Sequence, residues 1–205
     1  GIKMSSRLVK KDNIVFLGLP KNGSQAIKQL YKRNDGFEMV EIKTNWSADN
    51  FIDFYNKDVI ILFPMRTYRE RGLSELLERA IKFKYSKSDI EKIISNGFRP
   101  RFNYFDNIIM EFFITNILFN ENWNGCRIVF FDLKKLTTHI PKYIGMDIEI
   151  PYYNTVEENP RKKEIKQKFK ELNKNRPFES LTLHIPKLEK YLLDAIRNSK
   201  YWSDL

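Results

Sequence analysis

The chain has 205 residues, 42% of them hydrophobic and 14% aromatic, and a formal net charge of +10 at pH 7. This length and composition predict a single domain over residues 1–205 with enough apolar side chains for a real core. The one cysteine, Cys126, excludes an internal disulfide and fits a reducing compartment. No run approaches the ~18 apolar residues of a membrane span, and residues 1–13 lack the apolar segment of a signal peptide. We therefore expect a cytoplasmic protein.

Residues 13–29 contain the first informative pattern. Residues 14–17, Ile-Val-Phe-Leu, are a short apolar run rich in β-branched and aromatic side chains, which predicts a buried strand. Ala26, Ile27 and Leu30 follow with the spacing of one helix face. The segment therefore reads as a strand, a tight turn and a helix.

The turn of this segment, residues 18–24, has the features of an anion cradle. The N–H groups of a first helical turn have no partners within the helix, and the helix dipole favours negative charge beside them. Here those groups belong to Asn22, Gly23, Ser24 and Gln25, while Lys21 adds a positive charge and Ser24 a hydroxyl donor. The pattern predicts a phosphate site, with an ordinary strand-to-helix turn as the alternative.

The turn differs from the common nucleotide-binding loop. That loop, G-x-x-x-x-G-K-[ST], places its lysine directly after the second glycine, where it reaches the terminal phosphates. Gly18 and Gly23 have the matching spacing, but Ser24 follows Gly23 and the lysine comes earlier, at Lys21. A kinase with a variant loop is therefore a less favoured alternative.

A second strand and helix carry further candidate ligands. Residues 59–63, Val-Ile-Ile-Leu-Phe, predict another buried strand; Arg66 stands just beyond it, and Ser74 lies eight residues later on the following helix. A guanidinium at a strand end can grip phosphate oxygens bidentately, and the serine adds a hydroxyl donor. The alternative is a surface arginine and a helix-facing serine without a ligand.

Taken together, these motifs resemble the sulfotransferases that use 3′-phosphoadenosine 5′-phosphosulfate (PAPS). The Pro-Lys-x-Gly-Ser of residues 20–24 resembles their 5′-phosphosulfate loop, and Arg66 and Ser74 match their strand-end arginine and helix serine. Arg71 matches an arginine of the carbohydrate-modifying branch, which is the most similar one. The chain departs from the family at Thr67-Tyr68, where Asp-Pro is common. The resemblance covers residues 13–154 and weakens in its second half.

The fold expected on both grounds is α/β. Strands near residues 14, 38, 59 and 128 alternate with helices, which predicts a mostly parallel central sheet flanked by helices. The resemblance implies a P-loop-like sulfotransferase fold with a helical C-terminal part, in which Asp132 and Leu133 match a structural acidic-Leu pair. Ligands bind at the carboxyl ends of such strands, so the two candidate motifs are expected to meet at one crevice.

Several helices and their ends are predicted from periodicity and capping patterns. Ser88 and Glu91 suggest a capping box that starts a helix ending near Asn96-Gly97, and Pro160 is expected at the first position of a later helix. The other predicted helices span residues 47–56, 68–83, 104–119, 134–136 and 186–199. The helix over residues 104–119 is expected to be buried in the core.

The resemblance implies transfer of a sulfuryl group from PAPS to an acceptor hydroxyl. Lys21 and the backbone of residues 22–25 would hold the cofactor's 5′-phosphate, and Arg66 and Ser74 would complete the cofactor site. No metal is expected, because two histidines and one cysteine form no cluster. The acceptor is not identified by any motif; a glycan is the class that the resemblance favours.

An acceptor hydroxyl needs a general base. Our first candidate is Glu41, near the carboxyl end of the strand at residues 37–43, where the glycan-modifying branch has a catalytic glutamate. Glu38 on the same strand is an alternative, although a spacing of three makes the two face opposite sides. His139, in a predicted late loop, and His184 are less favoured. An exposed carboxylate without a catalytic role is the simplest alternative for Glu41.

Residues 161–176 form the most basic segment, with eight basic and two acidic residues and hence a net charge of +6. A solvated helix face is one interpretation. The other, implied by the resemblance, is that Arg161, Lys162 or Lys163 closes over the cofactor's 3′-phosphate. The basic character also keeps open a non-catalytic domain that binds nucleotide or nucleic acid, with nucleic acid the less favoured partner.

Overall fold

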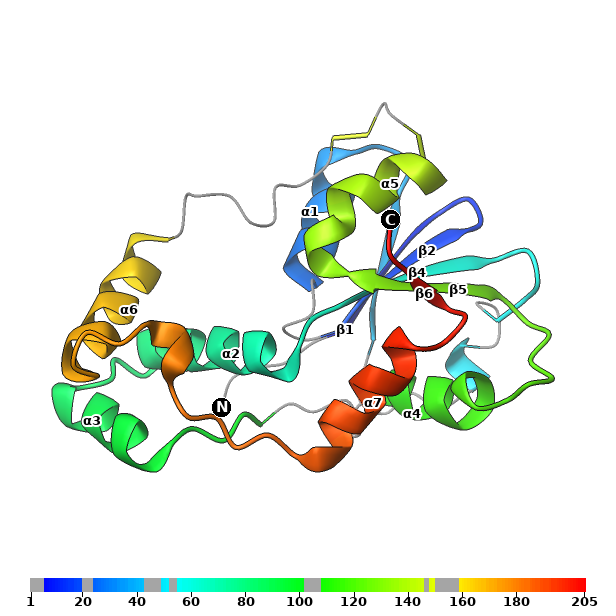
Figure 1. The fold of residues 1–205 in the computed structure, drawn as a ribbon. Coiled ribbons are helices and arrows are strands. Elements are labelled where there is room, and N and C mark those ends of the chain that lie inside the picture. Colours follow the sequence, from blue (N-terminus) through cyan, green and yellow to red (C-terminus); the bar gives the residue numbers. More distant parts are fainter. Residues whose placement is uncertain are drawn as a thin grey trace.

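The computed structural model describes residues 6–19, 24–42, 49–51, 55–101, 108–145, 148–149 and 159–205, and only the backbone of Ser24, Glu41 and Ile108. Within these residues the protein is an α/β structure with one sheet of strand order β3-β1-β2-β4-β5-β6 (Figure 1). The strands are β1 (Ser6–Lys11), β2 (Ile14–Gly18), β3 (Glu38–Ile42), β4 (Ile60–Met65), β5 (Arg127–Asp132) and β6 (Trp202–Ser203).

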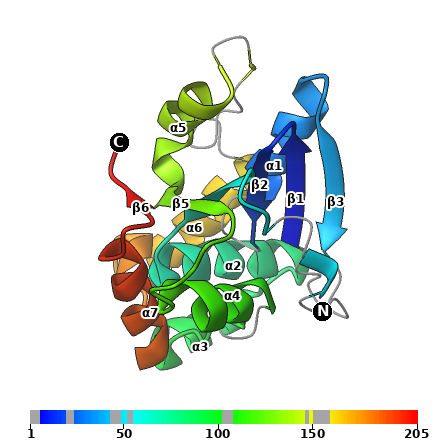
Figure 2. The same cartoon turned by 90° about the vertical axis from the view of Figure 1, so that its right-hand side faces the viewer.

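The sheet is mostly parallel, as the alternation of strands and helices predicted. The pairs β2–β4, β4–β5 and β5–β6 are parallel, whereas β1 is antiparallel to both β2 and β3. It follows that β3 runs in the same direction as β2, and that β1 alone among the described strands opposes the others. Figure 2 shows β3 at one edge of the sheet and β6 at the other.

Helices cover both faces of the sheet. One face packs against α1 (Ser24–Arg33) and α5 (Leu136–Tyr143), where Ile27 and Ile140 meet Phe16 of β2 in one apolar cluster. The other face packs against α4 (Ile108–Phe113), the π-helix η3 (Ile114–Leu118) and α7 (Lys187–Arg197). Strands buried on both faces read as continuous apolar runs, which is why β2, β4 and β5 were predictable.

Strand β1 was not predicted from the sequence. Leu8 and Val9 are its two buried apolar side chains; Leu8 packs in the cluster on the α7 side and Val9 in the cluster on the α1 side. The neighbouring strands β2 and β3 complete the hydrogen bonding of β1 on both sides. Two apolar residues among polar ones give no periodic signal, so only the tertiary structure defines this strand.

A third apolar cluster lies to one side of the sheet, beyond the end where β4 leads into α2 (Figure 1). It joins α2 (Tyr68–Lys82), α3 (Lys87–Asn96), α6 (Pro160–Leu172) and the 3₁₀ turn η5 (Phe178–Ser180). Leu76 of α2, Ile90 of α3 and Phe169 of α6 are buried in it. Of these helices, α6, together with α7, lies in the C-terminal part of the chain, where helices were expected.

Most predicted helix ends agree with the structure, and two do not. Pro160 begins α6 as predicted, and Gly97, with φ of 79°, ends α3. The capping box of α3 is formed by Ser86 and Asp89 and not by Ser88 and Glu91, so α3 begins before the predicted start. The chain is helical from Leu136 to Tyr143, beyond the predicted helix over residues 134–136, so His139 lies within α5 and not in a loop.

The predicted helix over residues 104–119 is described from residue 108 as α4 and η3. Its Met110, Phe113 and Ile117 are buried, in agreement with the predicted core position. Of the predicted helix over residues 47–56, the structure describes residues 49–51, which are 3₁₀-helical, and residues 55–56, which form a bend; the rest lies outside the described residues.

Candidate functional site

Strands β2 and β4 define the position at the carboxyl edge of the sheet where a ligand crevice is expected. They are adjacent and parallel, with Phe16 opposite Leu62. From β2 the chain continues through α1 to β3 on one side, whereas from β4 it leads to β5 on the other side. Ligands of open α/β sheets bind where neighbouring connections diverge in this way.

The first candidate motif begins at this crevice. Leu19, the residue after β2, is fully buried, and α1 starts at Ser24, directing its N-terminus toward the carboxyl edge. Gln25 is exposed, and only the backbone of Ser24 is described. Lys21, Asn22 and Gly23 lie outside the described residues, so their predicted roles stay predictions.

Arg66 lies at the same edge, one residue beyond β4. Its side chain is 17% exposed, and its Nε is 3.9 Å from Oε2 of Glu70 on α2. Ser74 is partly buried in α2, four residues after Glu70, and this spacing places both on one face of the helix. The structure therefore places Arg66 beside the helix face that carries Ser74.

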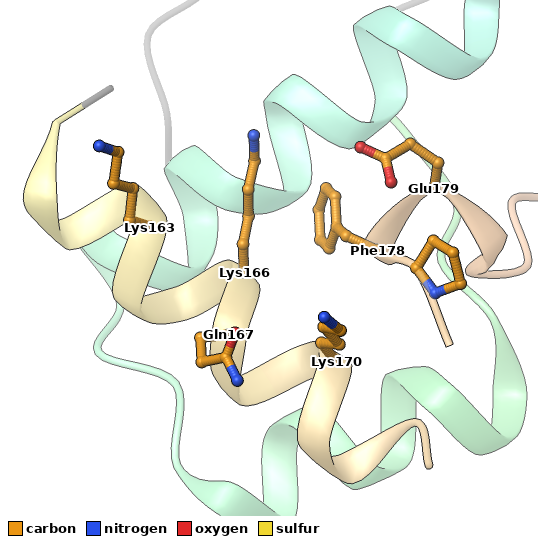
Figure 3. Close-up of a pocket in the computed structure, with 7 residues that line it drawn as sticks. Lys163, Lys166, Gln167, Lys170, Phe178 and Glu179 are labelled. Carbon is orange, nitrogen blue, oxygen red and sulfur yellow. The ribbon is translucent and has the colours of Figure 1, made fainter. Parts of the chain in front are cut away.

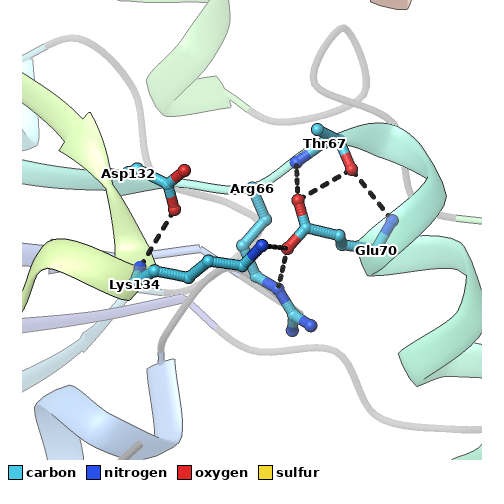
Figure 4. A network of polar contacts seen from close by, with 5 residues as sticks. All are labelled: Arg66, Thr67, Glu70, Asp132 and Lys134. Atoms are coloured by element: carbon cyan, nitrogen blue, oxygen red, sulfur yellow. Dashed lines mark hydrogen bonds and ion pairs between the residues drawn. The ribbon is translucent and has the colours of Figure 1, made fainter. Parts of the chain in front are cut away.

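Glu70 and Lys134 are members of this site that the sequence did not reveal (Figure 4). Oε1 of Glu70 accepts hydrogen bonds from the backbone N–H and hydroxyl of Thr67, at 3.3 and 2.9 Å, and Thr67 Oγ1 accepts from the Glu70 N–H at 3.1 Å. Oε2 of Glu70 lies 3.8 Å from Nζ of Lys134, which follows β5. The pattern Thr-x-x-Glu signals the capping box, but nothing in the sequence indicates the contact with Lys134.

The two candidate carboxylates of β3 lie at different ends of the strand. Glu41 is opposite Arg7 of β1, and Arg7 is also opposite Gly18 of β2. The backbone of Glu41 is therefore level with the end of β2, two strands away and about 10 Å from it. Glu38 is exposed and pairs with Lys10 at the far end of β3, away from the carboxyl edge.

The surroundings of His139 indicate a structural role and not that of a general base. It is fully buried and stacks on Phe131, with ring centroids 4.2 Å apart. Its Nδ1 is 2.8 Å from the carbonyl of Lys135, and its Nε2 is 2.8 Å from Oγ of Ser203. Burial lowers the pKa of His139, and the carbonyl requires a proton on Nδ1, so Nε2 accepts from the serine. Both ring nitrogens are engaged, which leaves none for an acceptor hydroxyl.

His184 is remote from the crevice. It is exposed, its Nε2 lies 3.0 Å from the carbonyl of Asn96 at the end of α3, and α3 belongs to the third apolar cluster.

Arg71 is buried in a position that argues against a ligand role. Its guanidinium donates to Glu189 of α7 at 2.7 Å, and the two side chains are 3% and 0% exposed. Arg71 also stacks over Tyr68 at 5.2 Å. The match to the arginine of the carbohydrate-modifying branch thus falls on a residue that joins α2 to α7.

The basic segment forms α6, where Arg161 and Lys162 are exposed. Further along, Lys163, Lys166 and Lys170 line a hollow between α6 and η5, together with Phe178 and Glu179 (Figure 3). The hollow concentrates positive charge. In the part of the chain that the structure describes, α6 packs on α2 and α3 in the third apolar cluster, which contains no residue of the sheet.

The fold and the site define an α/β protein with a cationic site at the carboxyl edge of its sheet. Comparison with protein-family models, curated proteins and solved structures found no match for the chain. In the described ranges, no helix has the length and apolar character needed to cross a membrane, and no three His, Cys, Asp or Glu side chains are grouped for a metal ion.

Proposed function

We propose that the protein is a PAPS-dependent sulfotransferase that moves a sulfuryl group to an acceptor hydroxyl. The observation that carries the proposal is the position of β2 and β4, which are adjacent and parallel and have diverging connections. This arrangement supports a single site for the strand-turn-helix of residues 14–30 and for Arg66. Their order along the chain is the order that the resemblance to sulfotransferases requires.

The residues near the crevice fit the chemistry of such a cofactor. Arg66 is a partly exposed cation at the strand end, and Ser74 offers a hydroxyl from the helix face beside it. They would hold the 3′-phosphate of the cofactor, while Lys21 and the start of α1 would hold its 5′-phosphate. The cofactor itself supplies the activated sulfuryl group, so the protein mainly has to position it and stabilise charge.

Glu41 is the proposed proton acceptor for the hydroxyl. Its backbone is level with Gly18 at the carboxyl edge, whereas Glu38 lies at the opposite end of β3 and His139 is enclosed in the core. A carboxylate at this position can take the proton as the oxygen forms its bond to sulfur. The acceptor class proposed is a hydroxyl-bearing glycan.

A second candidate function is a basic domain that binds polyanions without catalysis. The lysine-lined hollow of α6 favours it, since clustered positive charge attracts phosphate-rich polymers. Such binding would weaken steeply with added salt and would not depend on Arg66, which lies at the sheet edge.

The test is a calorimetric titration with 3′-phosphoadenosine 5′-phosphate, with AMP and ATP as controls. We expect tight binding of the 3′-phosphorylated nucleotide alone. Arg66→Ala should weaken it by about 10- to 100-fold, because one charge-assisted contact is lost. Arg33→Ala, at the exposed far end of α1, should leave it unchanged.

Three results would reject the proposal. Equal affinity for AMP and its 3′-phosphorylated form would exclude PAPS as the cofactor. A preference for ATP would favour a variant kinase. If Arg66→Ala binds 3′-phosphoadenosine 5′-phosphate with unchanged affinity, the proposed location of the cofactor site is wrong.

A further inference from the structure

The two carboxylate oxygens of Glu70 make contacts with different residues. Oε1 completes the capping box of α2 with Thr67. Oε2 lies 3.9 Å from Nε of Arg66 and 3.8 Å from Nζ of Lys134. A residue that already caps a helix thus also gathers two cations, one from the end of β4 and one from the end of β5 (Figure 4).

Both cations are held loosely by Glu70. Direct charge-assisted hydrogen bonds have lengths of about 2.7–2.9 Å, as in the buried pair between Arg71 and Glu189 at 2.7 Å. The separations at Glu70 are about 1 Å longer, and the Lys134 side chain is 62% exposed. An ion pair with such an exposed lysine contributes little to stability, so stability does not explain the position of Lys134.

The backbone at Lys134 is nevertheless held in place. Oδ1 of Asp132 accepts a hydrogen bond from the Lys134 N–H at 3.0 Å, and Asp132 pairs with Met65 in the β4–β5 ladder. This register brings Lys134, two residues after Asp132, near the end of β4, where Arg66 follows Met65. Because the backbone of Lys134 is fixed and a lysine side chain is long and flexible, its ammonium group can move from one oxygen atom to another.

Positive charge gathers around Glu70. Two cations lie near one of its carboxylate oxygens, and the N-terminus of α2 adds partial positive charge at the same place. We propose that Lys134 is a second cationic ligand for the anionic group bound by Arg66, and that Glu70 is a positioning residue that keeps the two cations together. The identity of the anion, a phosphate of the nucleotide, rests on the proposed function.

Three variants test this. Lys134→Ala removes the proposed ligand. Lys135→Ala is the matched control, an exposed lysine of the same turn, η4 (Leu133–Lys135). Glu70→Gln removes the charge but keeps an oxygen and an amide for the capping box. Each protein is titrated with inorganic pyrophosphate, followed by NMR chemical shifts, and with 3′-phosphoadenosine 5′-phosphate, followed by calorimetry.

We expect Lys134→Ala to lower the affinity for both anions by about tenfold. Its Tm should stay within about 2 °C of that of the unchanged protein. Lys135→Ala should bind as the unchanged protein does. Glu70→Gln should bind several-fold more tightly, because no carboxylate competes for the cations; a purely structural role of Glu70 would not produce that gain. The tenfold difference should shrink in added salt, which screens exposed charges.

The outcomes separate this inference from the proposed function. Equal affinity of Lys134→Ala and the unchanged protein for pyrophosphate would overturn the role of Lys134, as would no pyrophosphate binding to the unchanged protein at millimolar concentration. If the nucleotide binds no more tightly than pyrophosphate, the proposed function fails, while the pyrophosphate titrations still decide on Lys134.

Discussion

Replacement of Glu189 by Gln should destabilise the protein strongly, because it leaves the charge of Arg71 buried without its carboxylate. The side chains of Arg71 and Glu189 are 3% and 0% exposed and meet at 2.7 Å. With charge centres about 4 Å apart and an effective dielectric constant of about 20, their attraction is about 4 kcal/mol. Removal of one partner of a buried pair costs about 3–5 kcal/mol in other proteins, which agrees.

The assay is urea unfolding followed by circular dichroism, with thermal melting as a second measure. For a chain of this length, 4 kcal/mol corresponds to a fall in Tm of roughly 8–16 °C. The double variant Arg71→Met with Glu189→Leu should recover most of the loss, since two apolar side chains of similar size need no compensation for buried charge. It should also keep the nucleotide affinity of the unchanged protein.

Two results would refute this reasoning. A cost below about 1 kcal/mol for Glu189→Gln would mean that the pair is solvated and acts as a surface salt bridge. A folded double variant that had lost nucleotide binding would make Arg71 a candidate cofactor ligand and contradict its assignment to a structural pair with Glu189.

Two further predictions concern buried titratable groups. Burial lowers the pKa of His139, so the unfolded chain takes up a proton below about pH 6.5 before the folded protein does, and the free energy of unfolding should fall as the pH drops below that value. Urea unfolding at pH 7.5 and 5.5 should show a smaller fall in His139→Gln; an equal fall would contradict the prediction. Burial raises the pKa of Cys126 to about 12, so at pH 8 its thiolate fraction is on the order of 1000-fold below that of an exposed cysteine. Its labelling by Ellman's reagent should be slow until urea unfolds the protein, and rapid labelling of the folded protein would be inconsistent with this burial.

The α/β class and the main parallel strands were predictable, and the reason is local. β2, β4 and β5 are covered on both faces by helices, so each had to be an uninterrupted apolar run, and such runs are visible without any tertiary information. Helix ends were less certain. Around α3, Ser86 and Ser88 offer competing capping boxes, and only the formed structure chooses between them.

His139 shows how packing overrode a local signal. Pro141 follows two residues later and argues against a helix, because proline lacks an N–H donor. The chain is nevertheless helical from Leu136 to Tyr143, with Pro141 inside α5. Leu136 and Ile140 are buried against the sheet, and the stacking of His139 on Phe131 adds to that contact.

The sequence alone determined that two glycines and a lysine follow or end one strand, and that an arginine follows another, because these features are contiguous along the chain. Tertiary structure decided which of them meet. The parallel pairing of β2 with β4 brings their ends side by side at one edge of the sheet, and the β4–β5 pairing brings Lys134 to Glu70. The packing of α7 buries Arg71 against Glu189, 118 residues away. Contacts over such separations depend on strand register and helix packing, which sequence spacing does not encode.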